Sequence, residues 1–279
     1  MLVIAKFGGS SLATPNQFKK VKKIIEEDGN RRIIIVSALG KQKDEDVKLT
    51  DVLCKLSTSM YKTNHFEDLW ENVKQRFLEI KNQLNLTLDL ENEFDEIEQH
   101  FNHLTLSIEY VVSRGEYLTG KLMSEYIGYE FIDAKDVLIF KESGDLDLAV
   151  TQKKLLQTIK LTSRVVIPGF YGSYGGDRIH LFHRGGSDIT GAMVARLLNA
   201  SQYEKWTDVS GLSVGDPKLV KTPTFISQMT YSELRKFSCG SNGVIHEGII
   251  PLLEDVNVPT YIKNTNDPKA RGTLISTSC

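Results

Sequence analysis

Residues 2–11 read LVIAKFGGSS and place a lysine, two adjacent glycines and two serines directly after an apolar run. The apolar run predicts a short buried strand. The glycines allow the backbone to approach a ligand closely, and the lysine beside them indicates that this ligand is negatively charged. The stretch therefore predicts a strand that ends in a candidate phosphate-binding loop.

The segments that follow place a helix and a second strand after the first. Residues 13–28 predict a helix that Thr14 caps, with Pro15 at its first position and Gln17 at the capping-box position. Residues 31–38, RRIIIVSA, have the continuous apolar core that is typical of a parallel sheet. This strand–helix–strand order predicts an α/β fold.

The rest of the chain divides into a helical middle and a second strand-forming part. Between residues 49 and 129 the patterns are helical, which predicts a helical insert. Strands are expected at 136–140, 164–170, 203–209 and 258–264. A hairpin is expected at 174–183, with its turn at Gly175, Gly176 and Asp177, and a loop at 211–218. Helices are expected at 187–200, 230–237 and 244–256, the last of them kinked at Pro251. A soft division falls near Phe170.

Composition limits the class of protein. The 279 residues carry a formal net charge of −2 and no strongly basic segment, so nucleic acid is not an expected partner. No run approaches the ~20 apolar residues that span a bilayer, and no signal-peptide pattern is expected at the N-terminus. Cys54, Cys239 and Cys279 lie far apart, which disfavours a disulfide framework or zinc site and favours a reducing cytoplasm.

Two further clusters support an anion site, although no P-loop, G-x-G-x-x-G or HExxH motif occurs. RGGSD, residues 184–188, has paired glycines at a loop-to-helix junction, where free N–H groups suit an anion. Its plain alternative is a helix cap by Ser187 with a surface salt bridge. WTDVSG, residues 206–211, and GDPK, residues 215–218, form a strand end followed by a loop, where ligands bind in open α/β sheets. His180 and His183 are interpreted as structural.

In order along the chain, KFGGSS, VSA, RGE, RGGSD, WTDVSG, DPK and NTNDPKARGT resemble the motifs of aspartokinases, in the amino-acid kinase family. The resemblance covers residues 2–275. It implies a three-layer α/β/α sandwich over residues 1–279, with a substrate lobe at about 1–170 and a nucleotide lobe at about 171–279. Aspartokinases usually continue into ACT regulatory domains, which we do not expect in this chain, and family members usually form homodimers.

The resemblance implies transfer of the γ-phosphoryl group of ATP, as its Mg²⁺ complex, to the β-carboxylate of L-aspartate. This is the first step of aspartate-family amino-acid biosynthesis. Lys6 and Asp188 are the implied catalytic residues. The acceptor carboxylate has a pKa of about 4 and is already ionised at neutral pH, so it needs no general base. We therefore interpret Asp188 as an organiser of Lys6 or of a metal-bound water. No protein metal site is expected.

The family pattern also implies the substrate contacts, with Arg184 for the α-carboxylate and Glu116 for the α-amine. Where the pattern has a lysine near the nucleotide, this chain has Gly243, and Lys41 or Lys43 is the candidate replacement. The implied aspartate-binding residues are Ser37, Thr50, Glu116, Arg184 and Ser187, and the implied ATP-binding residues are Lys6, Gly8, Gly9, Ser10, Thr207, Asp208, Ser213 (for the usual tyrosine), Lys218 (for the usual arginine) and Gly243.

Two other hypotheses remain open at this point. One is a kinase of the same fold that acts on a different carboxylate or on carbamate. The other is a homologue that has lost turnover, which Gly243 suggests. The set of Lys6, Arg184 and Asp188 argues against this loss, because a decayed site has no reason to keep all three.

Overall fold

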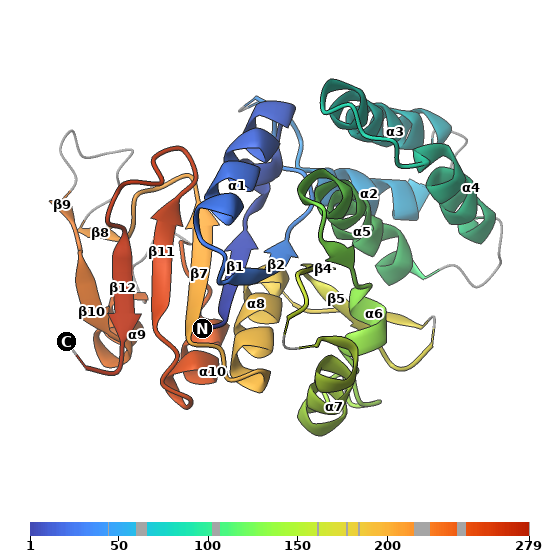
Figure 1. Ribbon diagram of the computed structural model, residues 1–279. Coiled ribbons are helices and arrows are strands. Elements are labelled where there is room, and N and C mark those ends of the chain that lie inside the picture. Colours follow the sequence, from blue (N-terminus) through green and yellow to red (C-terminus); the bar gives the residue numbers. More distant parts are fainter. Residues whose placement is uncertain are drawn as a thin grey trace.

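The computed structural model describes residues 1–43, 45–59, 66–101, 107–160, 162–176, 178–183, 185–214, 224–238 and 244–278 (Figure 1). Over these ranges the chain forms a central sheet of eight strands with helices on both faces. In spatial order the strands are β10 (Gln228–Thr230), β12 (Thr273–Ser276), β11 (Thr260–Asn264), β7 (Gln202–Thr207), β1 (Val3–Phe7), β2 (Arg31–Val36), β4 (Val165–Pro168) and β3 (Glu130–Phe131).

The direction of the strands fixes where a site can form. All pairs from β11 to β3 are parallel, whereas β12 runs antiparallel to β11 and β10 runs parallel to β12. The carboxyl ends of β11, β7, β1, β2 and β4 therefore lie at one edge of the sheet. In open α/β sheets this edge is the usual place for a ligand.

The central strands are apolar throughout because both of their faces are buried. Successive side chains of a strand point to opposite faces. On β2, Ile33 and Ile35 join one hydrophobic core, and Ile34 and Val36 join the other. This double burial explains why residues 31–36 show no polar alternation.

Five helices pack on the face that holds Ile34 and Val36. They are α1 (Pro15–Glu27), α2 (Leu49–Ser59), α3 (Phe66–Gln83), α4 (Leu90–Phe101) and α5 (Ile108–Ile127). Thr14 caps α1 as expected, since its hydroxyl accepts from the backbone N–H of Gln17 at 3.3 Å. The Gln17 side chain donates to the Ser10 carbonyl. Helices α2 to α5 form the expected helical insert.

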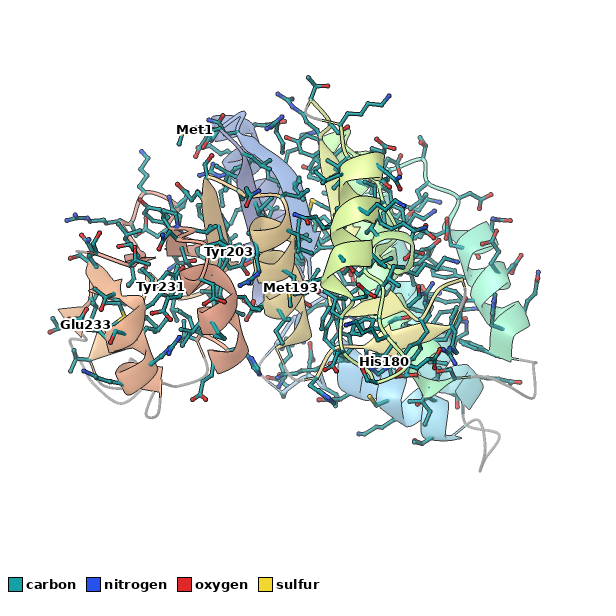
Figure 2. All side chains as sticks on the ribbon, turned by 90° about the horizontal axis from the view of Figure 1, so that it is seen from below. Met1, His180, Met193, Tyr203, Tyr231 and Glu233 are labelled. Carbon is teal, nitrogen blue, oxygen red and sulfur yellow. The ribbon has the colours of Figure 1, made fainter. Side chains whose placement is uncertain are left out.

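The other face is covered by α6 (Ala134–Val137), α7 (Leu148–Thr158), α8 (Gly186–Leu197), α9 (Tyr231–Ser238) and α10 (Ile250–Glu254). Figure 2 views this side, with Met193 on α8 and His180 on the hairpin of β5 (Tyr171–Ser173) and β6 (Ile179–Leu181). A Cβ on Gly191 would lie 2.7 Å from the Tyr203 ring. Glycine at this position therefore lets α8 approach β7 closely.

The three-layer α/β/α fold with its helical insert is confirmed, but two local predictions are wrong. The strand expected at residues 136–140 does not form. Asp136 and Val137 end α6, which the Asp133 side chain caps by accepting from Lys135 N, and Ile139 and Phe140 form isolated bridges. Pro251 does not kink a helix. It lies in the first turn of α10, after the 3-10 helix η2 (Glu247–Ile249), where a missing N–H has no cost.

Helix α7 and several short strands were not foreseen. The strands include β3, β12 and the pair β8 (Ser213–Val214) and β9 (Thr224–Phe225). Strands of two to four residues are too short to show a periodicity. None of the helices in the described ranges combines the length and apolar character that a bilayer crossing requires.

Candidate active site

Three charged side chains meet near the carboxyl edge of the sheet, and we call them the lysine–aspartate cluster: Lys6, Asp188 and Lys205. Lys6 on β1 and Lys205 on β7 are register partners, on the face that α8 covers. Lys6 Nζ lies 2.7 Å from Asp188 Oδ1, and Lys205 Nζ contacts Asp188 Oδ2. All three residues are at most 8% exposed. The cluster thus buries two cations with one anion.

The charges of the cluster keep Asp188 ionised. Burial alone would raise the pKa of Asp188, but Lys6 and Lys205 outweigh it and hold the pKa well below its usual range. Burial lowers the pKa of Lys205, against the attraction of Asp188. A carboxylate with so low a pKa is a poor general base at neutral pH. This favours the interpretation of Asp188 as an organiser of the two lysines.

The glycine loop after β1 leaves space beside the Lys6 ammonium. A Cβ on Gly8 would lie 3.7 Å from Lys6 Nζ, and Gly8 is followed by the 3-10 helix η1 (Gly9–Leu12). A Cβ on Gly40 would come within 2.2 Å of the Gly9 carbonyl oxygen, so the loops after β1 and β2 meet backbone to backbone. Ser10 is half-buried in the same loop. The loop could hold an anion against Lys6.

Glu116 on α5 is a buried carboxylate with an unused oxygen. The residue is 3% exposed, and its Oε2 atom has no hydrogen-bond partner. Burial raises its pKa to about 8, and the Ala38 backbone N–H and the charge of Lys6 offset this only in part. An unsatisfied buried carboxylate is costly for a folded protein. A cationic group of a ligand would remove this cost.

The hydroxyl residues expected at the substrate occupy three neighbouring elements. Ser37 follows β2, Thr50 lies in the first turn of α2, and Ser187 is buried in the first turn of α8. Ser187 does not cap α8, because Gly185 takes the N-cap position at φ 76°. A Cβ on Gly169, after β4, would lie 2.7 Å from Ser187 Cβ. The end of β4 and the start of α8 are therefore in close contact.

Of the residues expected at the nucleotide, Lys6, Gly8, Gly9 and Ser10 lie on β1 and in the loop after it, and three others lie at or after the end of β7. Thr207 ends β7 and donates from its hydroxyl to Asp208 Oδ1 at 3.1 Å, and Asp208 is exposed. Ser213 begins β8. These positions follow the strand that carries Lys205. Three other expected site residues lie outside the described residues: Arg184, Lys218 and Gly243.

The described residues offer no group of three His, Cys, Asp or Glu side chains that could hold a metal ion. Both Asp188 oxygens are engaged by lysines. His180 is structural, as expected: its Nδ1 lies 2.8 Å from Glu109 Oε1 and 3.0 Å from the Tyr174 hydroxyl. These contacts tie the β5–β6 hairpin to α5.

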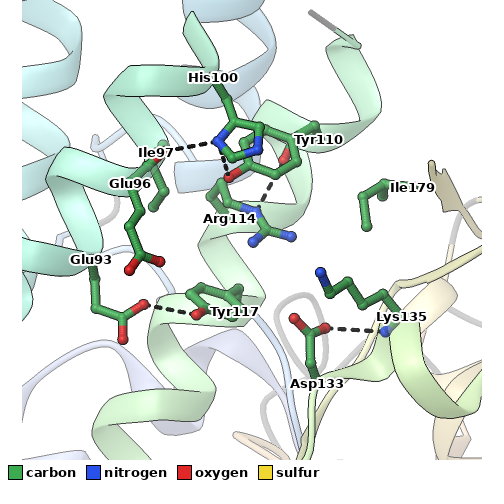
Figure 3. Close-up of a pocket in the computed structure, with 10 residues that line it drawn as sticks. All are labelled: Glu93, Glu96, Ile97, His100, Tyr110, Arg114, Tyr117, Asp133, Lys135 and Ile179. Atoms are coloured by element: carbon green, nitrogen blue, oxygen red, sulfur yellow. Dashed lines mark hydrogen bonds between the residues drawn. The ribbon is translucent and has the colours of Figure 1, made fainter. Parts of the chain in front are cut away.

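A cavity of about 190 Å³ opens between α4, α5 and α6 (Figure 3). Arg114, from the RGE motif, lies in its wall, with its guanidinium 4.3 Å from the Tyr110 ring centre and 4.4 Å from that of Tyr117. Glu116, two residues further along α5, is not among the described lining residues. Arg114 therefore lines this cavity and Glu116 does not, although both belong to the RGE motif. The cavity is separate from the lysine–aspartate cluster.

Lys205 is the member of the cluster that sequence reasoning missed. Lys41 and Lys43, named as candidate replacement cations, are exposed. The signal for Lys205 was a lysine inside the buried strand QYEKWT, two residues after the buried Tyr203 and therefore on the same face. What the sequence did not show is the register that pairs Lys205 with Lys6.

Comparison with known proteins agrees with this geometry. Residues 1–264 match the model of the amino acid kinase family, and the chain belongs to that family. Aspartokinase 3 of Bacillus subtilis is 34% identical over 98% of this chain and 63% of its own length. The crystal structure of Clostridium acetobutylicum aspartate kinase has a TM-score of 0.91 and 41% identity, over 99% of this chain and 62% of that one.

A more distant structure shows the same fold. Escherichia coli aspartokinase III, in complex with aspartate and ADP, has a TM-score of 0.87 at 23% identity, over 100% of this chain and 65% of that chain. The chain thus spans less than two thirds of the length of each of these three proteins.

Proposed function

We propose that this chain transfers the γ-phosphoryl group of ATP to the β-carboxylate of L-aspartate, giving 4-phospho-L-aspartate and ADP. The observation that carries the proposal is the buried Lys6–Asp188 pair beside Gly8, with the unused Glu116 carboxylate nearby. A cation for phosphate and an anion for an amine suit a kinase that acts on an amino acid. The relatives at 34% and 41% identity are named aspartokinase and aspartate kinase.

In the proposed reaction a β-carboxylate oxygen of aspartate attacks the γ-phosphorus of ATP. The bond between that phosphorus and the β–γ bridging oxygen breaks, and ADP leaves with the bond's electrons. Because the nucleophile is already ionised, no proton has to be removed. Catalysis then rests on position and charge. Lys6 neutralises charge on the transferring group, and Asp188 holds Lys6 in place.

Substrate recognition follows from the charges of aspartate. The α-amine binds Glu116, whose Oε2 lacks a partner in the folded chain. Arg184 binds the α-carboxylate in this proposal, on the family resemblance. Ser37, Thr50 and Ser187 add hydroxyl contacts near the ends of β2 and β4.

The nucleotide lies on the side of β7 and β8. Gly8, Gly9 and Ser10 receive its phosphates, and Thr207, Asp208 and Ser213 lie toward the nucleoside. Lys218 and Gly243 complete this set by resemblance. Mg²⁺ enters as the ATP complex, since the oxygens of Asp188 are engaged by lysines. The division into a substrate lobe (1–170) and a nucleotide lobe (171–279), a homodimer and a cytoplasmic location belong to the same proposal.

Trapping of the acyl phosphate tests this function. The chain is incubated with ATP, Mg²⁺, L-aspartate and hydroxylamine, and aspartyl hydroxamate is measured. We expect a hydroxamate that requires aspartate and disappears in Asp188→Ala. Glutamate, N-acetylglutamate and carbamate serve as alternative acceptors. A signal with one of these and none with aspartate would overturn the substrate, and no signal with any acceptor would overturn the activity.

A further inference from the structure

Lys205 is a lysine in the interior of a sheet, which is a costly position for a charge. Burial of a charge is tolerated when the charge is paired and hydrogen-bonded. Lys205 has Asp188 as its ion-pair partner, but Asp188 is already paired with Lys6. One lysine would suffice to neutralise the aspartate. The second leaves the buried cluster with a surplus positive charge.

The two lysines also have more N–H donors than the acceptors found for them. Each ammonium group has three N–H donors. Within the described ranges, Asp188 accepts a hydrogen bond from Lys205 and is the ion-pair partner found for Lys6. The neighbouring strand β11 places Ile262 in register with Lys205, and that side chain offers no acceptor. The remaining donors can be satisfied by a ligand that carries several oxygens.

The positions of the two lysines match such a ligand. They are register partners on adjacent parallel strands, which lie about 4.8 Å apart. The space beside Lys6 is kept open by Gly8, whose N–H donates to the carbonyl of Trp206, the residue after Lys205. A phosphate group on the loop side of the cluster is therefore within reach of both ammonium groups.

We infer that Lys205 is a second catalytic cation, which binds the phosphoryl group in transfer together with Lys6 while Asp188 holds both lysines. This rests on the proposed function. As the β–γ bond of ATP breaks, charge accumulates on the oxygens of the transferring and leaving groups, and two fixed cations stabilise it more than one. Lys205 forms no covalent bond and transfers no proton in this step.

The test compares three variants by hydroxamate formation. Lys205→Met removes the charge at similar length, Lys205→Arg keeps it, and Lys263→Met is the matched control. Lys263 lies on the neighbouring strand, with its Nζ 5.0 Å from the Trp206 ring centre, on the opposite face. We expect Lys205→Met to lower kcat about 100-fold, as for loss of one electrostatic stabiliser, with a KM for aspartate near that of the wild type. Lys263→Met should keep the wild-type kcat.

The pH profile separates catalysis from a merely structural role. The titratable groups that face Lys205 are Lys6 from β1, Asp188 from α8 and Tyr203 on its own strand. Wild-type kcat should fall at alkaline pH as Lys205 loses its proton. In Lys205→Arg this fall should move to higher pH, because a guanidinium stays charged. An unchanged alkaline profile in an active Lys205→Arg, or a Lys205→Met kcat within threefold of the control, would overturn the inference.

A binding measurement keeps the inference apart from the proposed function. Affinity for the Mg²⁺ complex of a non-hydrolysable ATP analogue is measured by calorimetry. If the wild type forms no acyl phosphate but Lys205→Met binds the analogue about tenfold more weakly than Lys263→Met, the activity fails and the cation role stands. Equal binding by the two variants would then overturn the role. Should Lys205→Met not fold, Asp188→Asn/Lys205→Met removes both charges and replaces it in the binding experiment, with Asp188→Asn as its reference.

Discussion

The two faces of the sheet each bury an ion cluster, and adjacent residues of β7 contribute to both. Glu204 points to one face, where its carboxylate accepts from Arg31 Nε at 2.7 Å and from Arg31 Nη2 at 3.2 Å. Lys205 points to the other face, where it shares Asp188 with Lys6. Both clusters are deeply buried, so burial alone does not distinguish them.

Completeness of pairing does distinguish them. In the Arg31–Glu204 pair the charges cancel, Arg31 Nη1 donates to the Ile24 carbonyl, and Glu204 accepts also from Trp206 Nε1 at 2.8 Å. In the lysine–aspartate cluster a charge is left over and donors remain for a ligand. In a balanced buried pair each charge depends on its partner, so removal of one partner is costly, whereas the surplus charge of an unbalanced cluster is a cost that a ligand can remove. This difference separates a pair whose groups satisfy one another from a cluster that can accept a ligand.

The largest expected effect comes from breaking the balanced pair. Arg31→Met leaves Glu204 buried without its counter-ion, and loss of one partner of a buried pair costs about 3–5 kcal/mol. We expect the free energy of unfolding, from urea denaturation, to fall by that amount. The kcat of the folded protein should stay near that of the wild type. A loss below about 1 kcal/mol would show that the pair does not stabilise the fold.

Breaking the unbalanced cluster should lower kcat strongly and the free energy of unfolding only a little. Lys6→Met leaves Asp188 paired with Lys205, so the cluster becomes neutral and the fold loses less than in Arg31→Met. The kcat should drop by roughly 10²–10³, which corresponds to about 3–4 kcal/mol of transition-state stabilisation. Hydroxamate formation and urea denaturation on the same preparation measure both quantities. Near-normal turnover would remove Lys6 from the mechanism.

The sequence predicted the parts of this comparison that depend on local pattern. Apolar continuity identified β1, β2 and β4, and helical spacing identified the insert. It failed at residues 136–140, where the cap by Asp133 outweighs the strand propensity of an apolar run. It also missed β12, which has four residues and is too short to show a periodicity.

For the candidate site, the sequence supplied residue types but not register. Lys6 and Asp188 were named, and they lie 2.7 Å apart. Lys205 was missed because its pairing depends on β7 lying next to β1, although nearly 200 residues separate the two in sequence. Because successive side chains of β7 alternate between the two faces, the same register places Glu204 on the face opposite Lys205. Glu204 therefore joins the pair with Arg31, and Lys205 joins the lysine–aspartate cluster. Such a relation between strands has no local signature.

Glu116 is a buried carboxyl group whose Oε2 has no hydrogen-bond partner, so it too can accept a ligand. Glu116→Gln should raise the KM for aspartate about tenfold, or about 1.4 kcal/mol, with a smaller change in kcat. Burial raises the pKa of Glu116 to about 8, so below that pH the group must lose a proton before it can bind the amine as an anion. Wild-type affinity for aspartate, measured by calorimetry, should therefore increase as pH rises toward about 8 and then level off.

The control for this pH effect is a half-buried carboxylate whose oxygens are hydrogen-bonded. Burial alone would raise the pKa of Glu125, but hydrogen bonds from the Thr87 hydroxyl and from the Thr87 and Leu88 backbone N–H groups outweigh it and lower the pKa. It stays ionised over the same pH range, so Glu125→Gln should keep the wild-type pH dependence. In Glu116→Gln the affinity should be flat. A Glu116→Gln profile that still rises with pH would place the amine elsewhere.

The smallest expected effect tests whether the open space beside Lys6 belongs to a ligand. Gly8 has φ −74°, which alanine adopts without strain, and the added Cβ would make ordinary contacts with Trp206 O and Lys6 Nζ. Gly8→Ala should therefore stabilise the fold by about 0.4–1 kcal/mol, through a less flexible unfolded chain. Yet the methyl group would occupy the space proposed for phosphate, and the KM for ATP should rise roughly threefold, or about 0.7 kcal/mol.

The control is Gly29→Ala, in the turn before β2, which should stabilise the fold without raising the KM for ATP. A Gly8→Ala variant that is more stable and binds ATP as well as the wild type would mean that the phosphates do not lie beside Lys6. In that case the surplus charge of the cluster would need another ligand.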